Sequence, residues 1–370
     1  MMRVKAAVMR EVNKPLSIEE VELAQPKEEE VLVKVSYCGF CHSDLALLTG
    51  TQPYPFPGVI GHEASGIVED VGPGVTTLKK GDHVVGTWMT ACGQCPECVK
   101  GWRYLCRRGR TIMANGTLLD GTSRLTDAHG DMLHHAGCVS GFAEYTVIPE
   151  LAAVKIREDM PLDQACFFGC AMPTGFGAVI NVAQVKPGDS VAIWGMGGVG
   201  LNVVQGAKLR GAYPIFGVDI EGSKEAIAKE FGVTHFINNS KEDPVPIIKE
   251  MTRGGVNFSF EVIGDAGATA QAYWAMGPKG KLVQIGGHPL GQGVELPLLF
   301  VSYGCQTIEG TTYGNTSARE DIPVFVDMVM RGVYKLDKLI SRKFKLDEIN
   351  NVAEALSKRQ VIGRWVCSFD

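Results

Sequence analysis

The sequence predicts an α/β protein in which a mostly β domain is followed by a doubly wound parallel sheet. Residues 1 to about 171 are rich in glycine and proline and contain short β-type runs such as 31–35 and 66–69, a pattern typical of a β domain with long loops. From about residue 187 apolar strand runs alternate with helical segments, and the first four elements fall at 190–194, 198–210, 215–218 and 223–231. Strands that alternate with helices in this way form βαβ units and a parallel sheet.

Two more strand runs, 258–262 and 281–285, continue the series. The tail from about residue 322 predicts one amphipathic helix and a closing β segment, 363–369, which we expect to return to the first domain. We therefore expect one domain to comprise residues 1–171 with 315–370 and the other residues 172–314.

The composition limits the function. With 370 residues, 45% of them apolar, the chain can bury a large core, and its net charge of −5 argues against nucleic-acid binding, which needs a clustered basic face. No apolar run reaches the length of a membrane span, and the N-terminus lacks the apolar region of a signal peptide. Eleven cysteines without a secretory signal favour a reducing, cytoplasmic location.

Four cysteines, Cys92, Cys95, Cys98 and Cys106, have the spacing C-x2-C-x2-C-x7-C. Four thiolates this close in sequence can surround one Zn²⁺ and close a tetrahedral structural site. The alternative is a group of free or disulfide-bonded cysteines, but the spacing favours a metal lobe at about residues 90–110.

A G-x-G-x-x-G pattern directly follows the strand that ends at Trp194. Its residues are Gly195, Gly197, Gly198, Val199 and Gly200, at the start of a helix. In this strand–turn–helix context the glycines favour a dinucleotide, with its pyrophosphate at the helix N-terminus. Asp219 ends the next strand, where its carboxylate can bind a ribose 2′-OH and repel a 2′-phosphate, which favours NAD over NADP.

A second set of zinc-type residues is scattered along the chain. Cys41, His62 and Cys170 together would supply three ligands and leave one position open, which is the arrangement of a catalytic zinc. Each residue alone is weak evidence, because a lone buried cysteine usually behaves as a small apolar group. Spacing cannot show that three distant residues converge.

These motifs resemble those of the zinc-dependent medium-chain alcohol dehydrogenases over essentially the whole chain. The matching segments are Cys41-His42-Ser43-Asp44, Gly61-His62-Glu63, the four-cysteine lobe, Gly169-Cys170 with Thr174-Gly175, the glycine loop and Asp219. The resemblance implies a GroES-like catalytic domain, a Rossmann domain, NAD and two zinc ions, one catalytic and one structural.

By this resemblance the catalytic zinc ligands are Cys41, His62 and Cys170, with Cys166 as a competing candidate outside the matched pattern. Asp44 and Glu63 match carboxylates that orient the ligands or tune the metal. The positions that match cofactor contacts are His42 and Arg364 at the phosphates, Lys224 at the adenosine ribose, and Thr174.

Ser43 matches the hydroxyl that takes the proton of the alcohol when hydride leaves for the nicotinamide. In many relatives the proton relay ends at a histidine five residues after the first cysteine ligand, and Ala46 occupies that position here. We therefore expect the proton to leave through water or another group.

Four residues match the substrate pocket of the family. Trp88 narrows the site near the metal, Ala136 and its neighbour Gly137 occupy positions often held by large apolar residues, and Arg110 matches a basic residue that binds anionic substrates. The expected substrate is an alcohol that is bulky or carries an anionic handle such as a thioester or thiol adduct.

Other functions remain open from the sequence. They are an S-(hydroxymethyl)thiol (formaldehyde adduct) dehydrogenase, a non-catalytic zinc-stabilised dinucleotide-binding protein, and a metal-free quinone reductase of the same superfamily. The segment 116–145 resembles the loop of the longer, dimeric members, so we expect a homodimer rather than a tetramer.

Overall fold

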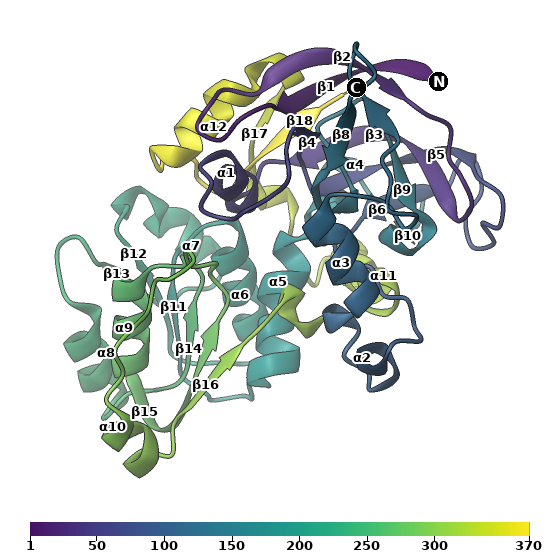
Figure 1. Cartoon of the computed structure of the whole chain (residues 1–370). Helices are drawn as coiled ribbons and strands as arrows, with labels where there is room; N and C mark the ends of the chain where they lie inside the picture. The colour runs from purple at the N-terminus through teal and green to yellow at the C-terminus, as the bar shows by residue number, and fades with distance from the viewer. Residues whose placement is uncertain (370) are drawn as a thin grey trace. The chain divides into compact units, whose positions relative to one another are not determined.

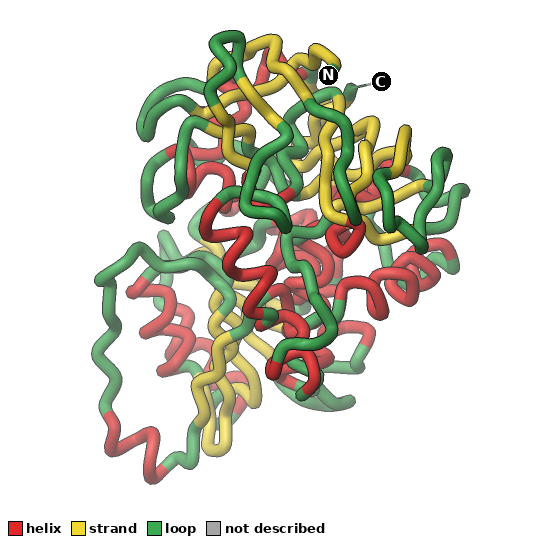
Figure 2. Tube along the Cα trace, turned by 45° about the vertical axis from the view of Figure 1, so that its right-hand side comes forward, coloured by secondary structure: helices red, strands yellow, loops and turns green. Residues whose placement is uncertain are grey.

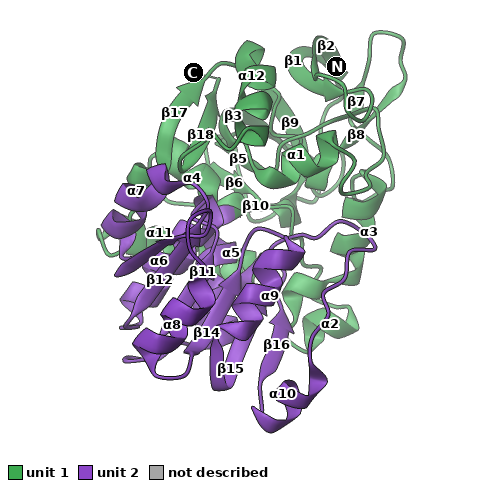
Figure 3. Ribbon diagram, turned by 90° about the vertical axis from the view of Figure 1, so that its left-hand side faces the viewer, with its two compact units in different colours: residues 1–170, 317–370 green, residues 171–316 purple. Residues whose placement is uncertain are grey.

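The computed structural model of the chain describes residues 1–369. It contains two compact units, one formed by residues 1–170 with the C-terminal segment from 317 and the other by residues 171–316 (Figure 3). The divisions lie at 170/171 and 316/317, where the sequence pattern suggested 171/172 and 314/315. The strands form separate groups in the two units (Figure 2).

Unit 1 is built from a small barrel and a twisted sheet. The barrel closes in the order β1-β2-β7-β8-β4, and the seven-stranded sheet has the order β10-β6-β5-β3-β18-β17, with β9 also paired to β3. The strands are β1 (Met2–Met9), β2 (Ser17–Leu23), β3 (Glu30–Gly39), β4 (Gly58–Val59), β5 (Glu63–Val71), β6 (His83–Gly86), β7 (Leu125–Thr126), β8 (Met132–His135), β9 (Tyr145–Pro149), β10 (Ala153–Lys155), β17 (Ile340–Phe344) and β18 (Arg364–Ser368).

The side chains of β1 alternate between two hydrophobic clusters in the core of unit 1. Val4 and Val8 point into one buried cluster, and Ala7 and Met9 point into the other. Successive side chains of a strand face opposite sides, so one strand can serve both cores. The helices of this unit are α1 (His42–Leu48), α2 (Pro96–Val99), α3 (Arg107–Asn115), α4 (Leu162–Ala165), α11 (Ala318–Met330) and α12 (Ile349–Ser357).

Unit 2 is a parallel sheet with helices on both faces (Figure 1). Its strand order is β13-β12-β11-β14-β15-β16, and every neighbouring pair is parallel. The strands are β11 (Val191–Trp194), β12 (Ile215–Asp219), β13 (His235–Asn238), β14 (Val256–Glu261), β15 (Met276–Gln284) and β16 (Thr307–Gly310). The order reverses between β11 and β14, and ligands of such sheets bind at this switch point, beyond the carboxyl ends of the strands.

The helices of unit 2 are α5 (Ala171–Gly177), which continues as a π-helix (Ala178–Ala183), α6 (Gly198–Leu209), α7 (Glu225–Phe231), α8 (Pro244–Thr252), α9 (Ala266–Trp274) and α10 (Leu298–Tyr303). Short 3-10 turns in the chain lie at Arg103–Leu105, Ala136–Cys138, Glu150–Ala152, Cys166–Gly169, Gly222–Lys224, Tyr313–Asn315, Asp337–Leu339 and Leu346–Glu348. The sequence did not predict α10.

The C-terminal segment returns to unit 1, because β18 pairs antiparallel with β3. The expectation of a single helix in this tail was wrong: α11 and α12 are both helices, and β17 adds a strand. Pro323 weakens the helical signal of α11 in the sequence, yet the buried side chains of Ile322, Phe325 and Val326 anchor this helix.

Within residues 1–369, no single helix is long and apolar enough to cross a membrane. The bent pair Leu162–Gly169 and Ala171–Ala183 passes that test only when its two helices are taken together, by length and composition.

Candidate metal centres and cofactor site

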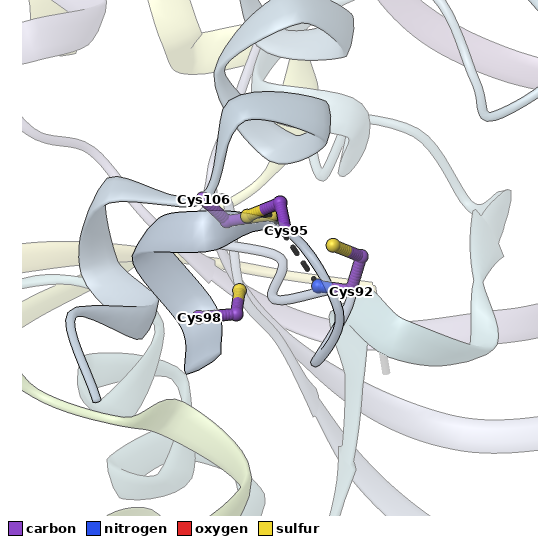
Figure 4. Close-up of side chains that lie close together, drawn as sticks. All are labelled: Cys92, Cys95, Cys98 and Cys106. Carbon is purple, nitrogen blue, oxygen red and sulfur yellow. Dashed lines mark hydrogen bonds between the residues drawn. The ribbon is translucent and has the colours of Figure 1, made fainter. Parts of the chain in front are cut away.

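The four cysteines of the lobe converge as the spacing predicts. Figure 4 shows their sulfur atoms around one common space, and all four lie within 4.8 Å of one another. The Cys95 and Cys106 sulfurs are 3.9 Å apart. Four sulfurs at about 2.3 Å from a tetrahedral zinc would be about 3.8 Å from each other, so the donor set fits this ion with little adjustment.

Local backbone geometry places these cysteines. Cys95 precedes α2 and Cys106 is the N-cap of α3, where its sulfur accepts the Gly109 N–H at 3.5 Å and the Cys92 N–H at 3.3 Å. Gly93 turns the chain with φ +77°, which costs little without a Cβ. The N–H donors stabilise negative charge on sulfur, the form that binds metal.

The second metal set is brought together within unit 1. Donor atoms of Cys41, His62, Glu63 and Cys170 lie within 4.8 Å of one another, and all four residues are buried. Cys41 is the N-cap of α1, His62 and Glu63 follow β4 at the start of β5, and Cys170 follows the 3-10 turn Cys166–Gly169. The cluster contains Cys170 and not Cys166, whose sulfur donates to the carbonyl of Asp163 at 3.1 Å.

Asp44 fixes the imidazole of His62. Its Oδ1 lies 3.1 Å from His62 Nδ1, and its Oδ2 accepts the Cys41 N–H at 2.8 Å. Asp44 is fully buried. His62 Nε2 is also buried and has no hydrogen-bond partner, so the remaining ring nitrogen is available for a ligand. Carboxylate–histidine pairs of this kind orient the ligands of zinc sites.

Neighbouring groups shift the pKa values of two residues in this cluster. Although burial alone would lower it, the Asp44 carboxylate raises the pKa of His62 well above its usual value. A hydrogen bond from Cys170 lowers the pKa of the Cys41 thiol well below its usual value, despite burial. Two thiols and one imidazole with an orphaned nitrogen therefore fit zinc with one coordination position left over.

Glu63 lies among the candidate metal ligands, with a carboxylate oxygen within 4.8 Å of their donor atoms. Its Oε1 pairs with Arg364 at 3.0 Å, and its buried Oε2 has no hydrogen-bond partner. Burial raises the pKa of Glu63 to about 7, against the opposite effect of the Arg364 guanidinium. A Cβ at Gly39 would meet Glu63 Oε2 at 2.3 Å, so only glycine at this position leaves space for the carboxylate.

Arg364, which the resemblance assigns to the pyrophosphate, is almost fully buried beside the metal ligands. It donates to Glu63 and, at 3.2 Å, to the carbonyl of Phe40, while its Nε has no partner. The hydrogen bonds of Arg364 are thus with Glu63, a member of the metal cluster, and with the backbone of Phe40 beside it.

Ser43 lies next to the same cluster. Its Oγ is 3.8 Å from the sulfur of Cys41, and its side chain is partly buried in the first turn of α1. His42, at the start of this helix, is exposed. Ala46 is also on α1 and has no group that accepts a proton.

The glycine loop has the geometry that its pattern predicts. Gly195 has φ +101°, and a Cβ at Gly200 would lie 1.8 Å from the Gly195 carbonyl oxygen. Around Gly197, the N-cap of α6, the space is open. The loop therefore packs tightly on its own strand and leaves the N-terminus of α6 accessible, as pyrophosphate binding requires.

Asp219 and Lys224 form a pair beside this loop. Asp219 Oδ2 accepts the Met196 N–H at 2.7 Å and the Lys224 ammonium at 2.9 Å, and its Oδ1 accepts the Glu221 N–H at 2.9 Å. The carboxylate thus connects the loop after β11 with the end of β12.

Thr174 and Gly175 lie on α5. The Thr174 hydroxyl is buried and has no hydrogen-bond partner. A Cβ at Gly175 would come within 2.5 Å of the Val199 carbonyl oxygen, so glycine permits the close approach of α5 to α6.

The pocket residues predicted from the sequence occupy different environments. Gly137 lies between Trp88 and His62: a Cβ there would be 2.8 Å from the Trp88 Cβ and 3.6 Å from the His62 Cβ. Ala136 instead belongs to the buried core of unit 1 and is only 2% exposed, so Gly137 is the member of this pair that neighbours the metal ligand. Arg110 is exposed on α3.

Sequence reasoning missed two apolar residues at the carboxyl edge of the unit 2 sheet. Ile220 follows β12 and is 36% exposed, and Ile263 lies just beyond β14 and is 53% exposed. Ile263 also borders Gly195. Exposed isoleucines beside a glycine loop suit the faces of an apolar ring. In the sequence, the position of these two isoleucines just after the end of a strand could have indicated them.

Comparison with known proteins agrees with this architecture. Residues 27–158 match the alcohol dehydrogenase GroES-like domain, and residues 198–331 match the zinc-binding dehydrogenase family. The chain is 40% identical over 360 residues to alcohol dehydrogenase class-3 of Cereibacter sphaeroides and 40% identical over 364 residues to S-(hydroxymethyl)glutathione dehydrogenase of Paracoccus denitrificans. Each match covers 94% of this chain and 95% of the relative.

Two solved structures superimpose along the whole chain. An alcohol dehydrogenase zinc-binding domain protein from Burkholderia ambifaria has a TM-score of 0.94 at 37% identity, with 100% of this chain and 99% of that chain covered. Benzyl alcohol dehydrogenase from Acinetobacter calcoaceticus has a TM-score of 0.92 at 34% identity, with 100% of both chains covered.

The fold and the two metal centres define a zinc-dependent oxidoreductase. The chain belongs to the zinc-dependent medium-chain alcohol dehydrogenases. It is an NAD-dependent enzyme that acts on small-molecule alcohols.

Proposed function

We propose that this enzyme oxidises bulky primary or secondary alcohols at a zinc ion held by Cys41, His62 and Cys170. The observation that carries the proposal is the buried convergence of these three donors, with His62 fixed through Nδ1 and Nε2 left for the metal. Cys92, Cys95, Cys98 and Cys106 are proposed to hold the structural zinc.

When bound, zinc supplies a Lewis acid that lowers the pKa of a hydroxyl group, and NAD supplies the hydride acceptor. The side chains of the protein orient the metal ligands and accept the proton. Asp44 holds the His62 ring, and Ser43, beside Cys41, takes the hydroxyl proton at Oγ. Ala46 cannot pass the proton on, so it leaves through water or through the neighbouring exposed His42.

Ser43→Ala should lower the rate of hydride transfer by more than about tenfold, because the hydroxyl that accepts the proton is lost while the ligands remain. Single-turnover measurements with an alcohol deuterated at the reacting carbon isolate this step. Ser43→Thr retains a hydroxyl and should keep most of the rate, and Ser357→Ala, at the exposed C-terminal end of α12, is a control. Near-normal hydride transfer in Ser43→Ala would remove Ser43 from the relay.

Gly137 allows the backbone to pack closely against the side chain of Trp88. A Cβ at this position would meet the Trp88 Cβ at 2.8 Å, so the glycine itself leaves no open space beside Trp88 and His62. An aromatic substrate is favoured instead by Trp88, whose ring would contact it, and by benzyl alcohol dehydrogenase among the similar structures. A second candidate substrate is the S-(hydroxymethyl) adduct of a thiol such as glutathione, favoured by exposed Arg110 and by the names of two relatives.

For the cofactor, we propose that Asp219 binds the adenosine ribose and that Lys224 contacts the same sugar. The Asp219 carboxylate would repel a 2′-phosphate, although the ammonium of Lys224 reduces this effect. The glycine loop from Gly195 to Gly200 would receive the pyrophosphate with Val199 and Gly198 at the start of α6, and the exposed side chain of Ile220 would lie beside the adenine. His42 and Arg364 are proposed to contact the cofactor phosphates, and Thr174 is proposed as a further cofactor contact.

A homodimer is proposed from the edge of the unit 2 sheet. β16 is the last strand of the sheet, and α10, just before it, exposes Leu298 to 74% and Tyr303 to 85%. An open edge strand beside an exposed apolar helix favours pairing with a second copy. Light scattering after size exclusion should give twice the chain mass. A cytoplasmic location is proposed because the six cysteines of the two metal sets must stay reduced.

The proposed function is tested by a substrate screen with NAD and with NADP, following reduced cofactor by absorbance and zinc by elemental analysis. Aromatic alcohols, long aliphatic alcohols and S-(hydroxymethyl)glutathione are compared at equal concentration. Higher kcat/KM for the aromatic alcohols with NAD supports the first candidate, and preference for the thiol adduct supports the second. No turnover of any alcohol by enzyme with two zinc ions per chain would contradict the proposed function.

A further inference from the structure

The carboxyl edge of the unit 2 sheet carries a polar network separate from the glycine loop. Glu261 ends β14 and Gln284 ends β15, and the amide nitrogen of Gln284 donates to Glu261 Oε2. The same nitrogen lies 3.0 Å from His288 Nε2, and His288 Nδ1 lies 3.1 Å from Gln292 Oε1. The two N–H groups of the Gln284 amide therefore lie within reach of three partners: Glu261, His288 and, at 3.3 Å, the Gly286 carbonyl.

Glu261 connects the loops that follow both strands. Its Oε1 accepts the N–H groups of Ile263 at 2.7 Å and Gly264 at 2.8 Å in its own loop. Its main-chain carbonyl accepts those of Ile285 at 2.9 Å and Gly286 at 3.0 Å in the loop after β15. Glu261 is fully buried, and burial raises the pKa of its carboxyl group against the effect of these backbone donors.

The two loops pack backbone against backbone. A Cβ at Gly264, which has φ +82°, would lie 2.4 Å from the Gly287 carbonyl oxygen, and one at Gly286 would lie 2.0 Å from the Gly264 nitrogen. With so little space, the backbone after β14 and the backbone after β15 must move together. Their common position therefore depends on the hydrogen bonds to Glu261.

These loops belong to the half of the sheet that the proposed ribose and pyrophosphate contacts leave free. The glycine loop and Asp219 follow β11 and β12, whereas Glu261 and Gln284 end β14 and β15, across the switch point in strand order. A dinucleotide spans such a switch point, with one nucleotide on each half. With the adenosine ribose at Asp219, the second nucleotide faces the loops after β14 and β15.

We propose that Glu261, Gln284 and His288 form a positioning network that fixes the backbone after β14 and β15 for the nicotinamide half of NAD. This inference rests on the proposed function of the cofactor site. The three residues act through the backbone that they hold, so their loss should weaken binding of the nicotinamide nucleotide and leave binding of the adenosine half unchanged.

The experiment compares the binding of NADH with that of ADP-ribose, which lacks the nicotinamide. Gln284→Met keeps the length of the side chain and removes both N–H donors, leaving the buried Glu261 carboxylate one hydrogen bond short. We expect the dissociation constant of NADH, measured by calorimetry on the zinc-loaded enzyme, to rise about tenfold, and that of ADP-ribose to change by less than about twofold.

Gln306→Met is the matched control. Gln306 precedes β16, at the opposite edge of the same sheet, where its amide donates to the Gly277 carbonyl at 3.3 Å. His288→Phe, in a partly exposed loop, is a second variant that guards against a folding defect of Gln284→Met, and it should weaken NADH binding about threefold, again without affecting ADP-ribose.

If the network variants bind NADH and ADP-ribose with equally weakened affinity, the positioning network is wrong. It is also wrong if NADH binding is unchanged in both Gln284→Met and His288→Phe. The proposed function stands in either case. A wild-type enzyme that binds neither NADH nor ADP-ribose would overturn the cofactor site and the network together. The two failures are therefore distinguishable by the wild-type titration alone.

Discussion

Replacing Cys170 by serine should abolish alcohol oxidation and lower the zinc content from two ions per chain to one. The sulfur of Cys170 is one of the two thiols in the cluster with His62, and serine is a much poorer ligand for zinc than a thiolate. Loss of a neighbouring orienting residue alone costs 10- to 100-fold at such sites, so loss of a direct ligand should lower turnover by more than about a hundredfold.

Cys166→Ser is the matched control for this substitution. Cys166 is buried four residues earlier in the same segment, but its sulfur donates to the Asp163 carbonyl, an interaction that a hydroxyl can preserve. This variant should keep two zinc ions and most of the activity. If Cys166→Ser loses the metal and Cys170→Ser keeps it, the ligand assignment must be exchanged between the two cysteines. If Cys170→Ser retains both ions and full activity, the proposed centre does not exist.

Local sequence motifs were sufficient to predict the four-cysteine lobe and the glycine loop. The four lobe cysteines lie within one short segment, so their spacing nearly determines the metal cluster. The glycine loop is similarly local, because its strand, turn and helix are consecutive along the chain. In both cases the residues that must meet are joined by a few backbone torsions, and sequence spacing constrains their distance directly.

Contacts between distant segments required the structure. Arg364 and Glu63 are 301 residues apart and meet because β18 pairs with β3, which in turn pairs with β5. The single-sequence pattern of the tail predicted that it would return but not its register, and register decides which side chain faces the metal ligands. The convergence of Cys41, His62 and Cys170 was for the same reason inferred from resemblance and not from spacing.

The roles of the two small residues of the predicted pocket became distinct only in the structure. Gly137 and Ala136 are adjacent and both small, and no sequence pattern distinguishes their roles. The structure separates them because Gly137, with φ +57°, turns toward Trp88 and His62, while Ala136 packs in the core. The sequence does not predict the hydrogen-bond network around Glu261 either. Its partners lie in loops, where no periodic pattern indicates which side chain contacts which backbone group.

Cys106→Ala should remove the structural zinc and destabilise the lobe around residues 92–106, while the catalytic centre keeps its ion. Cys106 is fully buried, lies 3.9 Å from the Cys95 sulfur and begins α3, so its loss removes a metal ligand and a helix cap together. Removal of a structural metal is among the few single changes that cost more than about 3 kcal/mol.

The lobe should open before the rest of the molecule, because a segment that loses its metal can unfold locally at a free energy below that of global unfolding. Limited proteolysis with mass spectrometry should therefore show new cleavage between residues 92 and 110 in Cys106→Ala. A chelator should produce the same cuts in the wild type, which would place the effect on the metal and not on the missing side chain.

Cys138→Ala separates loss of zinc from loss of a buried sulfur. Cys138 is as deeply buried as Cys106 but packs in the apolar core of unit 1, outside both metal sets. Both substitutions remove one sulfur atom, so the packing cost should be similar and only Cys106→Ala should lose zinc. Equal zinc content and equal proteolytic resistance in the two variants would show that the four cysteines do not depend on a metal.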